Sequence, residues 1–245
     1  MTKNDLIAYG KNVVENIIIN RPKLIKRLFI LKGNSFTPSI FSTIKKYNIL
    51  WESLDKDIFI KMLVDKKSVH QGYLAILKDF EYAKFSLTEN QNIKTILMLD
   101  KIHDPHNFGA IIRSSSLLGV DAIIMKDINQ VDVTSSVIKA SSGTIYNIPI
   151  IKVKNLSSSL DNLKKKGFWI YASALNEKSV SLNTINIYEK KVIILGNEGE
   201  GISNNLLNNS DFVFKIKTTN VIDSLNVSVA CGIILYNFFI NRTED

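Results

Sequence analysis

Cysteine and histidine are almost absent from this chain of 245 residues, which has one cysteine, Cys231, and three histidines. A single cysteine excludes an intrachain disulfide, and the few cysteine and histidine residues do not have the spacing of a zinc site. We therefore expect no bound metal. Cys231 is expected to be a small hydrophobic residue of the core, as free cysteines usually are.

Long apolar runs are missing as well. The longest, such as the run around Gly232 to Tyr236, falls well short of the roughly 20 residues that span a bilayer. The first five residues include an acid, and the apolar core of a signal peptide does not follow them. We therefore expect a cytoplasmic protein without a membrane span.

Arginine is scarce, and positive charge is unevenly distributed. Of the 31 basic residues 27 are lysines, and Arg113 is the only arginine between Arg27 and Arg242. Residues 1–90 hold 15 Lys and Arg against 9 Asp and Glu, a surplus of +6, whereas residues 91–245 hold 16 against 14, a surplus of +2. A basic surplus favours a polyanionic partner, because cations that neutralise phosphates release counterions. A solvated lysine surface is the alternative, and charge alone does not separate the two.

Helical spacing and short apolar runs alternate in the N-terminal part of the chain. Helical patterns cover residues 6–19, 38–47 and 55–63, and strand patterns cover residues 28–31, 49–51 and 73–77. Lys32, Gly33 and Asn34 predict a turn after the first of these strands. The pattern predicts a small α/β sandwich.

A polar stretch from Asp79 to Asn92 has no clear periodicity, so we place a linker at residues 80–92 between domains 1–79 and 93–245. Beyond it, strand patterns recur at residues 95–99, 122–125, 148–151, 168–172, 192–195 and 212–216. Helix-length segments separate most of these strands. This alternation predicts an α/β domain with a mostly parallel sheet covered on both faces.

Three segments in the second domain carry residues typical of a functional site. The first, Asp100 to Arg113, follows a predicted strand, and its residues Pro105 and Gly109 fix the path of a loop into a helix that Asn107 is suited to cap. Arg113 would then point toward the carboxyl edge of the sheet. Its planar guanidinium is a bidentate donor that lysine cannot replace. The alternative is a structural turn with a surface arginine.

The second segment is a glycine-rich loop after the strand at residues 192–195. Gly196, Gly199 and Gly201 let the backbone turn tightly and approach a ligand closely. The residue order is neither that of a Walker loop nor that of a dinucleotide-binding loop. Taken alone, such a loop is a weak indication of a nucleotide-like ligand.

The third segment, residues 224–230, opens the last predicted helix, which runs to residue 240. Polar side chains and free N–H groups gather at this helix start, and Ser224 or Asp223 would cap it. Leu225, Val229, Ile233 and Tyr236 fit one stripe of the helix. Taken alone, the segment predicts an ordinary cap followed by a stripe that faces the core.

Together and in this order, the three segments resemble the motifs of the SpoU family of RNA 2′-O-ribose methyltransferases, which belongs to the SPOUT superfamily. The motifs appear here as Asp104-Pro-His-Asn-Phe-Gly-Ala-Ile-Ile-Arg113-Ser, Leu195-Gly-Asn-Glu-Gly-Glu-Gly201 and Ser224-Leu-Asn-Val-Ser-Val-Ala230. The resemblance covers about residues 93–241. It implies an α/β fold with a deep trefoil knot near the C-terminus, which periodicity could not have predicted.

The resemblance also implies that the knot holds S-adenosylmethionine as the cofactor. The residues implied in binding it are Leu195, Gly196, Asn197, Gly199, Ile216, Leu225 and Asn226, with Ser142 and Gly143 of another family element nearby. After Ile216 the family commonly has Pro-Met and then a glycine two residues later, where this chain has Lys217-Thr-Thr-Asn220. We therefore expect the wall of the cofactor pocket to differ in detail while the pocket itself persists.

By the same resemblance Arg113 is the catalytic residue, and Asn107, Glu198, Ser224 and Asn226 shape the site. Methyl transfer requires in-line attack by the ribose 2′-oxygen together with loss of its proton. An arginine is a poor base because its guanidinium stays protonated. We therefore favour Arg113 as the residue that positions the substrate phosphate and stabilises charge. The proton acceptor, either an RNA phosphate or a transiently neutral Arg113, stays open.

The N-terminal domain resembles the substrate-binding domain of bacterial 23S ribosomal RNA guanosine-2′-O-methyltransferases, which is similar to ribosomal protein L30e. Residues 68–75 and the helix–strand order carry this resemblance, which implies RNA capture by the more basic part of the chain. We interpret His70 as structural or RNA-facing. The family also implies a homodimer whose site is completed across the interface.

The expected target is therefore a guanosine of 23S ribosomal RNA, either free or in a pre-ribosomal particle. A transfer-RNA ribose methyltransferase of the same family shares all three motifs and is one alternative. A non-catalytic RNA-binding or ribosome-assembly protein that keeps the fold is the other.

Overall fold

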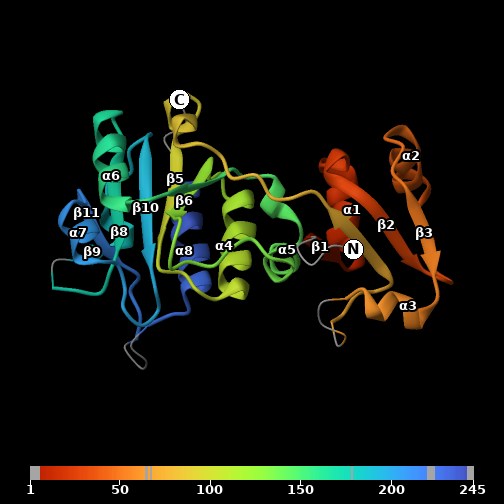
Figure 1. Cartoon of the computed structure of the whole chain (residues 1–245). Coiled ribbons are helices and arrows are strands. Elements are labelled where there is room, and N and C mark those ends of the chain that lie inside the picture. The colour runs from red at the N-terminus through yellow and green to blue at the C-terminus, as the bar shows by residue number, and fades with distance from the viewer. Residues whose placement is uncertain (1–5, 64–65, 67, 178, 220–223, 242–245) are drawn as a thin grey trace. The chain divides into compact units, whose positions relative to one another are not determined.

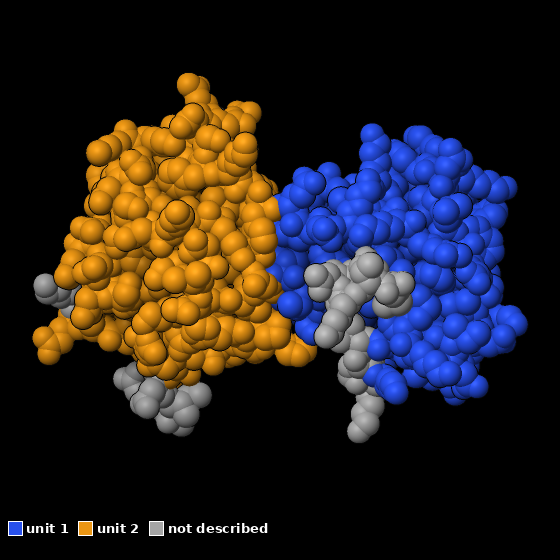
Figure 2. Space-filling model, in the orientation of Figure 1, with its two compact units in different colours: residues 1–81, 133–147 blue, residues 82–132, 148–245 orange. Residues whose placement is uncertain are grey.

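The computed structural model describes residues 6–63, 66, 68–177, 179–219 and 224–241. The chain forms two compact units (Figure 2), of which unit 1 comprises Met1–Glu81 and Val133–Asn147 and unit 2 comprises Tyr82–Asp132 and Ile148–Asp245. Within the described residues, no helix is both long enough and apolar enough to cross a membrane.

Unit 1 is built on a four-stranded sheet. Its strands are β1 (Leu6–Tyr9), β2 (Ile25–Leu31), β3 (Trp51–Leu54) and β4 (Tyr73–Leu77), in the order β1-β4-β2-β3. β4 is antiparallel to both of its neighbours, whereas β3 runs parallel to β2 at the edge of the sheet. The helices are α1 (Lys11–Asn20), α2 (Pro38–Lys46), α3 (Lys56–Lys61) and α5 (Ser135–Ala140). The α/β character predicted for this part of the chain is confirmed.

Two element boundaries in unit 1 differ from the predictions. The helix predicted over residues 6–19 is wrong at its start, because β1 pairs with β4 and α1 begins only at Lys11. Gly10 separates the two elements with φ 98°, a conformation that favours glycine. The strand predicted over residues 49–51 begins later, at Trp51. In both places strand pairing outweighs the local pattern.

His70 has a structural role in the turn before β4. Its Nδ1 atom accepts a hydrogen bond from the backbone N–H of Gly72 at 3.0 Å. Its ring lies 5.0 Å from the ring of the buried Phe59 of α3. Both contacts favour the structural interpretation of this residue.

A segment from the second half of the chain, Val133–Asn147, belongs to unit 1. The hydroxyl of Ser135 accepts a hydrogen bond from the backbone N–H of Ile7 at 3.1 Å. Arg21 Nε donates to the carbonyl oxygen of Tyr146 at 2.7 Å, and Lys139 Nζ donates to the carbonyl oxygen of Val69 at 2.9 Å. A division of the sequence into two consecutive domains could not have predicted that residues 133–147 belong to unit 1.

The stretch predicted to be a linker, residues 80–92, is mostly packed onto unit 2. Ala83 donates its backbone N–H to the carbonyl oxygen of Ile150 at 2.8 Å. A short 3-10 helix, Phe85–Glu89, follows, and the side chains of Phe85 and Leu87 pack against the core of unit 2. These apolar residues, spaced between polar ones, anchor a segment whose composition is typical of a linker.

Unit 2 contains a seven-stranded sheet in which all neighbouring strands are parallel. The strands are β5 (Thr95–Asp100), β6 (Ala122–Lys126), β7 (Ile150–Val153), β8 (Trp169–Ser173), β9 (Val180–Ser181), β10 (Lys191–Gly196) and β11 (Phe212–Lys215). Their order is β7-β6-β5-β10-β8-β11-β9. The helices are α4 (Pro105–Leu117), α6 (Leu156–Lys165), α7 (Asn204–Asn208) and α8 (Val227–Ile240). The predicted parallel sheet is confirmed, although the short β9 was not predicted.

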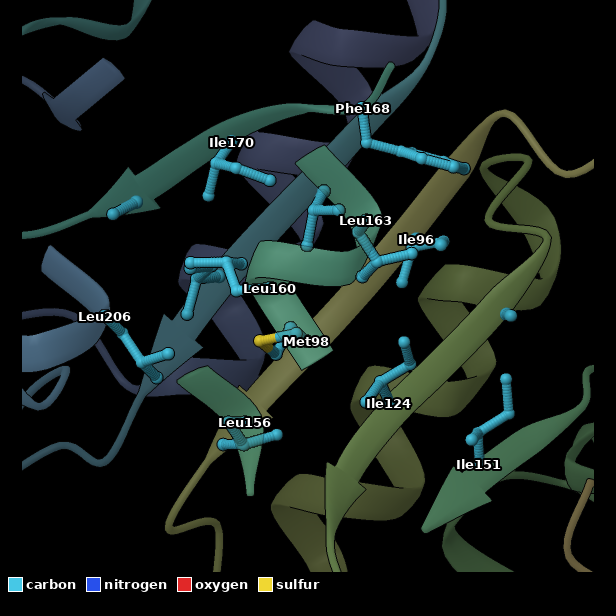
Figure 3. Packing of buried hydrophobic residues seen from close by; sticks show 14 of the residues in the cluster. Ile96, Met98, Ile124, Ile151, Leu156, Leu160, Leu163, Phe168, Ile170 and Leu206 are labelled. Atoms are coloured by element: carbon cyan, nitrogen blue, oxygen red, sulfur yellow. The ribbon is translucent and has the colours of Figure 1, made fainter. Parts of the chain in front are cut away.

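Helices cover both faces of this sheet (Figure 1). On one face, Leu160 and Leu163 of α6 pack among Ile96 and Met98 of β5 (Figure 3). On the other face, α8 lies beside α4, and the ring of its Phe238 lies 5.1 Å from the ring of Tyr171. Successive side chains of a strand point to opposite faces of the sheet. Because helices bury both faces, nearly every residue of these strands is apolar.

The side chain of Tyr171 brings a polar hydroxyl group into the core of unit 2. Its hydroxyl donates to the carbonyl oxygen of Asn186 at 2.8 Å and accepts from the backbone N–H of Tyr188 at 3.0 Å. Burial raises the pKa of Tyr171 from 10.0 to about 12. The neutral hydroxyl therefore stabilises the folded state fully below pH 10, and this contribution falls as the pH rises through 12.

We predict that Tyr171→Phe lowers the free energy of unfolding by about 1–3 kcal/mol, because two backbone groups lose their partner. Urea unfolding at neutral pH measures the change. Tyr188→Phe is the matched control, since the hydroxyl of Tyr188 makes no hydrogen bond within the described residues, and it should cost less than about 0.5 kcal/mol. Equal effects of the two substitutions would contradict the prediction.

Candidate active site

The strand-loop-helix corner after β5 is held by its own side chains. Asp104 caps α4, because its Oδ1 atom accepts a hydrogen bond from the backbone N–H of His106 at 2.9 Å. Pro105 occupies the first helical position, where its missing N–H costs nothing. The prediction that Asn107 caps this helix is wrong. Asn107 lies within the first turn, so its side-chain amide is free for contacts outside the helix.

The glycine-rich loop after β10 closes tightly on itself. A Cβ atom on Gly196 would lie 2.3 Å from the backbone of Gly201, so only glycine fits there. Asn197 holds the loop, because its Oδ1 atom accepts from the N–H of Gly199 at 2.7 Å and its Nδ2 atom donates to the carbonyl oxygen of Lys101 at 3.0 Å. The loops after β5 and β10 are therefore bonded to each other.

The start of α8 differs from the prediction in two respects. The helix begins at Val227, and Asn226 rather than Ser224 caps it, since its Oδ1 atom accepts from the backbone N–H of Ser228 at 3.0 Å. Asp223, the other predicted cap, and Asn220 lie outside the described residues. Of the stripe that was expected to face the core, Leu225 is half-buried and precedes the helix, whereas Val229, Ile233 and Tyr236 are exposed. The buried face of α8 is formed instead by Cys231, Ile234, Leu235 and Phe238.

The carboxylate of Glu198 joins the three predicted segments. Its Oε1 atom accepts hydrogen bonds from Asn107 Nδ2 at 3.0 Å, from Asn226 Nδ2 at 2.7 Å and from the backbone N–H of Val227 at 3.1 Å. Asn226 Nδ2 also donates to Asn107 Oδ1 at 3.0 Å. The negative charge lies at the N-terminus of α8, where the helix dipole favours it. We call Asn107, Glu198, Asn226 and Val227 the Glu198 junction.

A cavity of about 480 Å³ opens beside this junction, at the carboxyl ends of β8, β10 and β11. Its volume lies within the range of small-molecule sites. Residues predicted to bind the cofactor line it: Leu195, Gly196, Asn197, Gly199, Ile216 and Leu225. Glu198 and Ser224 line it as well. Asn107 and Asn226 contribute through the Glu198 junction.

Other predicted residues lie elsewhere. Ser142 and Gly143 belong to unit 1, where Gly143 lies against Ile17 and the carbonyl oxygen of Val13, and they are not among the residues that line the cavity. Arg113 is exposed on α4 and makes no hydrogen bond or ion pair with another described residue.

One part of the cavity wall was not predicted. Ser173 at the end of β8 and Ala174, Leu175 and Asn176 after it line the cavity together with Thr218. The position of this loop after a parallel strand could have predicted its place in the wall, because loops at the carboxyl ends of such strands form binding crevices. Lys217 and Thr219, in the stretch that departs from the family pattern, are exposed. Thr218 nevertheless takes part in the wall.

Metal ligands are not grouped anywhere in the part of the chain that the structure describes, since no three His, Cys, Asp or Glu side chains come together there.

Comparisons with known proteins agree with this geometry. Residues 94–236 match the model of the SpoU rRNA Methylase family, and residues 7–83 match the model for RNA 2′-O ribose methyltransferase substrate binding. A Staphylococcus aureus protein assigned to the TrmH family of tRNA/rRNA methyltransferases is 32% identical over 255 aligned positions, which cover 98% of both chains.

Solved structures share the fold of this chain. The AdoMet-bound rRNA methyltransferase from Sinorhizobium meliloti superposes with a TM-score of 0.79 at 22% identity, over 98% of this chain and 88% of that one. The A. aeolicus TrmH/SpoU tRNA modifying enzyme superposes with a TM-score of 0.57 at 29% identity, over 64% of this chain and 80% of that one. The predicted fold class is confirmed, while the knot stays a prediction. Because the family model matches residues 94–236, more than half of its length, the chain belongs to the SpoU rRNA methylase family.

Proposed function

We propose that this protein transfers a methyl group from S-adenosylmethionine to a ribose 2′-hydroxyl of RNA. The observation that carries the proposal is the Glu198 junction, which fixes three motifs of the family around one cavity. A protein that had kept only the fold would have no need of this set of polar contacts. The non-catalytic alternative is therefore disfavoured.

The cavity suits S-adenosylmethionine on several grounds. Apolar side chains of Leu195, Ile216 and Leu225 offer a surface for an adenine ring, and Gly196 permits the tight turn of the loop that borders it. The backbones of Ile216 and Leu225 make no hydrogen bond with other described residues, so their N–H and C=O groups are available to the base. When bound, the cofactor supplies a methyl group made electrophilic by its sulfonium.

Arg113 acts on the RNA in this proposal. Its guanidinium is carried on helix α4 and binds the phosphate next to the reactive ribose. This contact aligns the 2′-oxygen with the methyl group and stabilises the negative charge that develops as the oxygen loses its proton. Asn107, Glu198 and Asn226 hold the surrounding loops in place.

The proposed target is ribosomal RNA, specifically a guanosine of 23S ribosomal RNA, and we place its recognition in residues 1–79 and the reaction in residues 93–245. The match of residues 7–83 to a substrate-binding model and the basic surplus of residues 1–90 support this division. Transfer RNA is the second candidate, favoured by the likeness to the A. aeolicus tRNA modifying enzyme. We propose a cytoplasmic enzyme, where either RNA would be found.

An exposed apolar stripe supports a homodimer. Four residues of α8 spaced as one helical face are largely exposed: Val229 (52%), Ile233 (41%), Tyr236 (57%) and Ile240 (55%). Leu117 of the neighbouring α4 is 70% exposed. A contiguous apolar surface of this kind marks an interaction site. Because a twofold interface uses the same patch on both subunits, we propose that α8 and α4 pack against their copies.

We predict that Arg113→Ala lowers methyl transfer by at least about 100-fold while leaving S-adenosylmethionine affinity unchanged, because the cation acts on the RNA. Arg113→Lys, which keeps the charge but loses the bidentate fork, should have an intermediate rate. Cells that lack the protein should be complemented with the wild type or with Arg113→Ala. Mapping of 2′-O-methyl ribose in their 23S ribosomal RNA and transfer RNA then identifies the target.

The expected outcome is one site in 23S ribosomal RNA that only the wild type restores. A site in transfer RNA instead would select the second target. Near-normal methylation by Arg113→Ala would refute the role of the arginine, and an unchanged methylation map would refute the proposed reaction.

We predict that Ile233→Glu converts the dimer to monomers, because it places a charge within the apolar stripe. Light scattering at micromolar concentration measures the mass. Ile19→Glu is the matched control, since Ile19 is an isolated isoleucine of α1 with 61% exposure, and this variant should remain dimeric. A wild-type monomer, or a dimer that survives Ile233→Glu, would refute the proposed interface.

A further inference from the structure

Three aromatic rings form a cluster at the edge of the sheet in unit 1, in which Trp51 is exposed and Phe36 and Phe41 are half-buried. Trp51 lies on the edge strand β3, Phe41 on α2 and Phe36 in the loop before α2. The ring centre of Trp51 lies 5.7 Å from that of Phe36 and 6.1 Å from that of Phe41, with edge-to-face geometry in both pairs. Trp51 is 45% exposed. We call Phe36, Phe41 and Trp51 the aromatic cluster.

The cluster is fixed in place by the buried side of the unit. Tyr73 of β4 is buried, its ring contacts that of Phe36 at 5.8 Å, and its hydroxyl donates to the carbonyl oxygen of Ser35 at 2.7 Å. The loop that carries Phe36 is thus tied to a central strand. A rigid aromatic surface loses little conformational entropy when it binds a ligand.

The surroundings of the cluster are positively charged. Lys45 Nζ lies 4.7 Å from the ring centre of Phe41, and Lys46 follows it at the end of α2. Neither lysine pairs with a carboxylate among the described residues, whereas Glu52, beside Trp51, is bound to Arg27 at 2.8 Å. The free charge next to the rings is therefore cationic.

This combination distinguishes between partners. An exposed aromatic surface alone would also suit a protein, but the centres of protein interfaces are depleted in lysine. Aromatic rings with unpaired lysines beside them are instead the arrangement that binds single-stranded nucleic acid, since bases stack on the rings and the cations meet the phosphates. The bases of an intact duplex are stacked on each other and cannot reach such a surface.

We propose that the aromatic cluster is a stacking platform for unpaired bases of the substrate RNA, with Lys45 and Lys46 binding the adjoining phosphates. The proposal rests on the proposed function, since RNA is the substrate there. It adds that unit 1 selects an unpaired segment, such as a loop or bulge, and that Trp51 is the central contact. Recognition by unit 1 would then depend on exposed bases rather than on duplex shape.

Fluorescence can test the platform, because Trp51 and Trp169 are the only two tryptophans of the chain. In the full-length Trp169→Phe variant, Trp51 is the single reporter. The probes are an unstructured RNA strand of about 12 nucleotides, within the usual site size, and a blunt duplex of the same sequence. We expect the single strand to quench Trp51 and to bind at least about tenfold more tightly than the duplex.

Substitutions in the otherwise wild-type chain extend the test. Trp51→Ala should weaken binding of the single strand roughly 5- to 150-fold, the range for loss of one stacked base, while Trp51→Phe retains most of the affinity. Lys45→Ala combined with Lys46→Ala should reduce the salt dependence of binding. Trp169→Ala is the matched control, as an exposed aromatic residue of unit 2, and should leave binding unchanged. Unchanged calorimetric affinity for S-adenosylmethionine and unchanged thermal unfolding show that the variants are folded.

Two outcomes separate this proposal from the proposed function. If Trp51→Ala binds the single strand as tightly as the wild type, or if the duplex quenches Trp51 equally, the stacking platform is refuted. Methyl transfer to RNA by the same preparation would leave the proposed function standing, and a protein partner would become the better occupant of the cluster. Absence of methyl transfer by the wild type with every RNA tested would count against the proposed function.

Discussion

The three hydrogen bonds to the carboxylate of Glu198 are the constraint on which the site depends. They bind the first turn of α4, the loop after β10 and the N-terminus of α8 to one oxygen atom. Glu198 is exposed, so these bonds contribute little to global stability compared with the core. Their consequence is positional, because three loops that could each adopt other conformations are held in one arrangement around the cavity.

The sheet of unit 2 makes this arrangement available. Because β5, β8, β10 and β11 are all parallel, their carboxyl ends meet at one edge, and the segments that follow them become neighbours. The tight turn at Gly196 then directs Glu198 toward α4 and α8. Arg113 lies farther along α4, and its side chain makes no hydrogen bond or ion pair within the described residues.

Much of this organisation could be predicted from the sequence. Apolar runs of strand length predict the buried strands β4, β5, β6 and β10 because both faces of each are covered, and eight of the 21 residues that line the cavity were predicted as site residues. Contacts between distant segments could not be predicted. Periodicity contains no information that residues 133–147 pack on unit 1, or that Leu6–Tyr9 form a strand by pairing with β4.

The residues that cap the helices and the helix faces that are buried could not be predicted from the local sequence either. Asp104 and Asn226 cap α4 and α8, although Asn107 and Ser224 have equally suitable side chains, because loop geometry decides which oxygen reaches the free N–H groups. The stripe of Ile233 and Tyr236 is apolar like a core face, yet it is exposed. A sequence pattern indicates that a helix has an apolar face, but not whether the same chain covers that face.

Calorimetric titration of S-adenosylmethionine into the wild type and into Glu198→Ala tests the central claim most directly. We expect the wild type to bind the cofactor and Glu198→Ala to bind it at least about tenfold more weakly, a loss of about 1.4 kcal/mol. Thermal unfolding of the two proteins should remain similar, since the carboxylate is exposed. Equal affinity of both proteins would contradict the account, because the cavity would then keep its shape without the Glu198 junction.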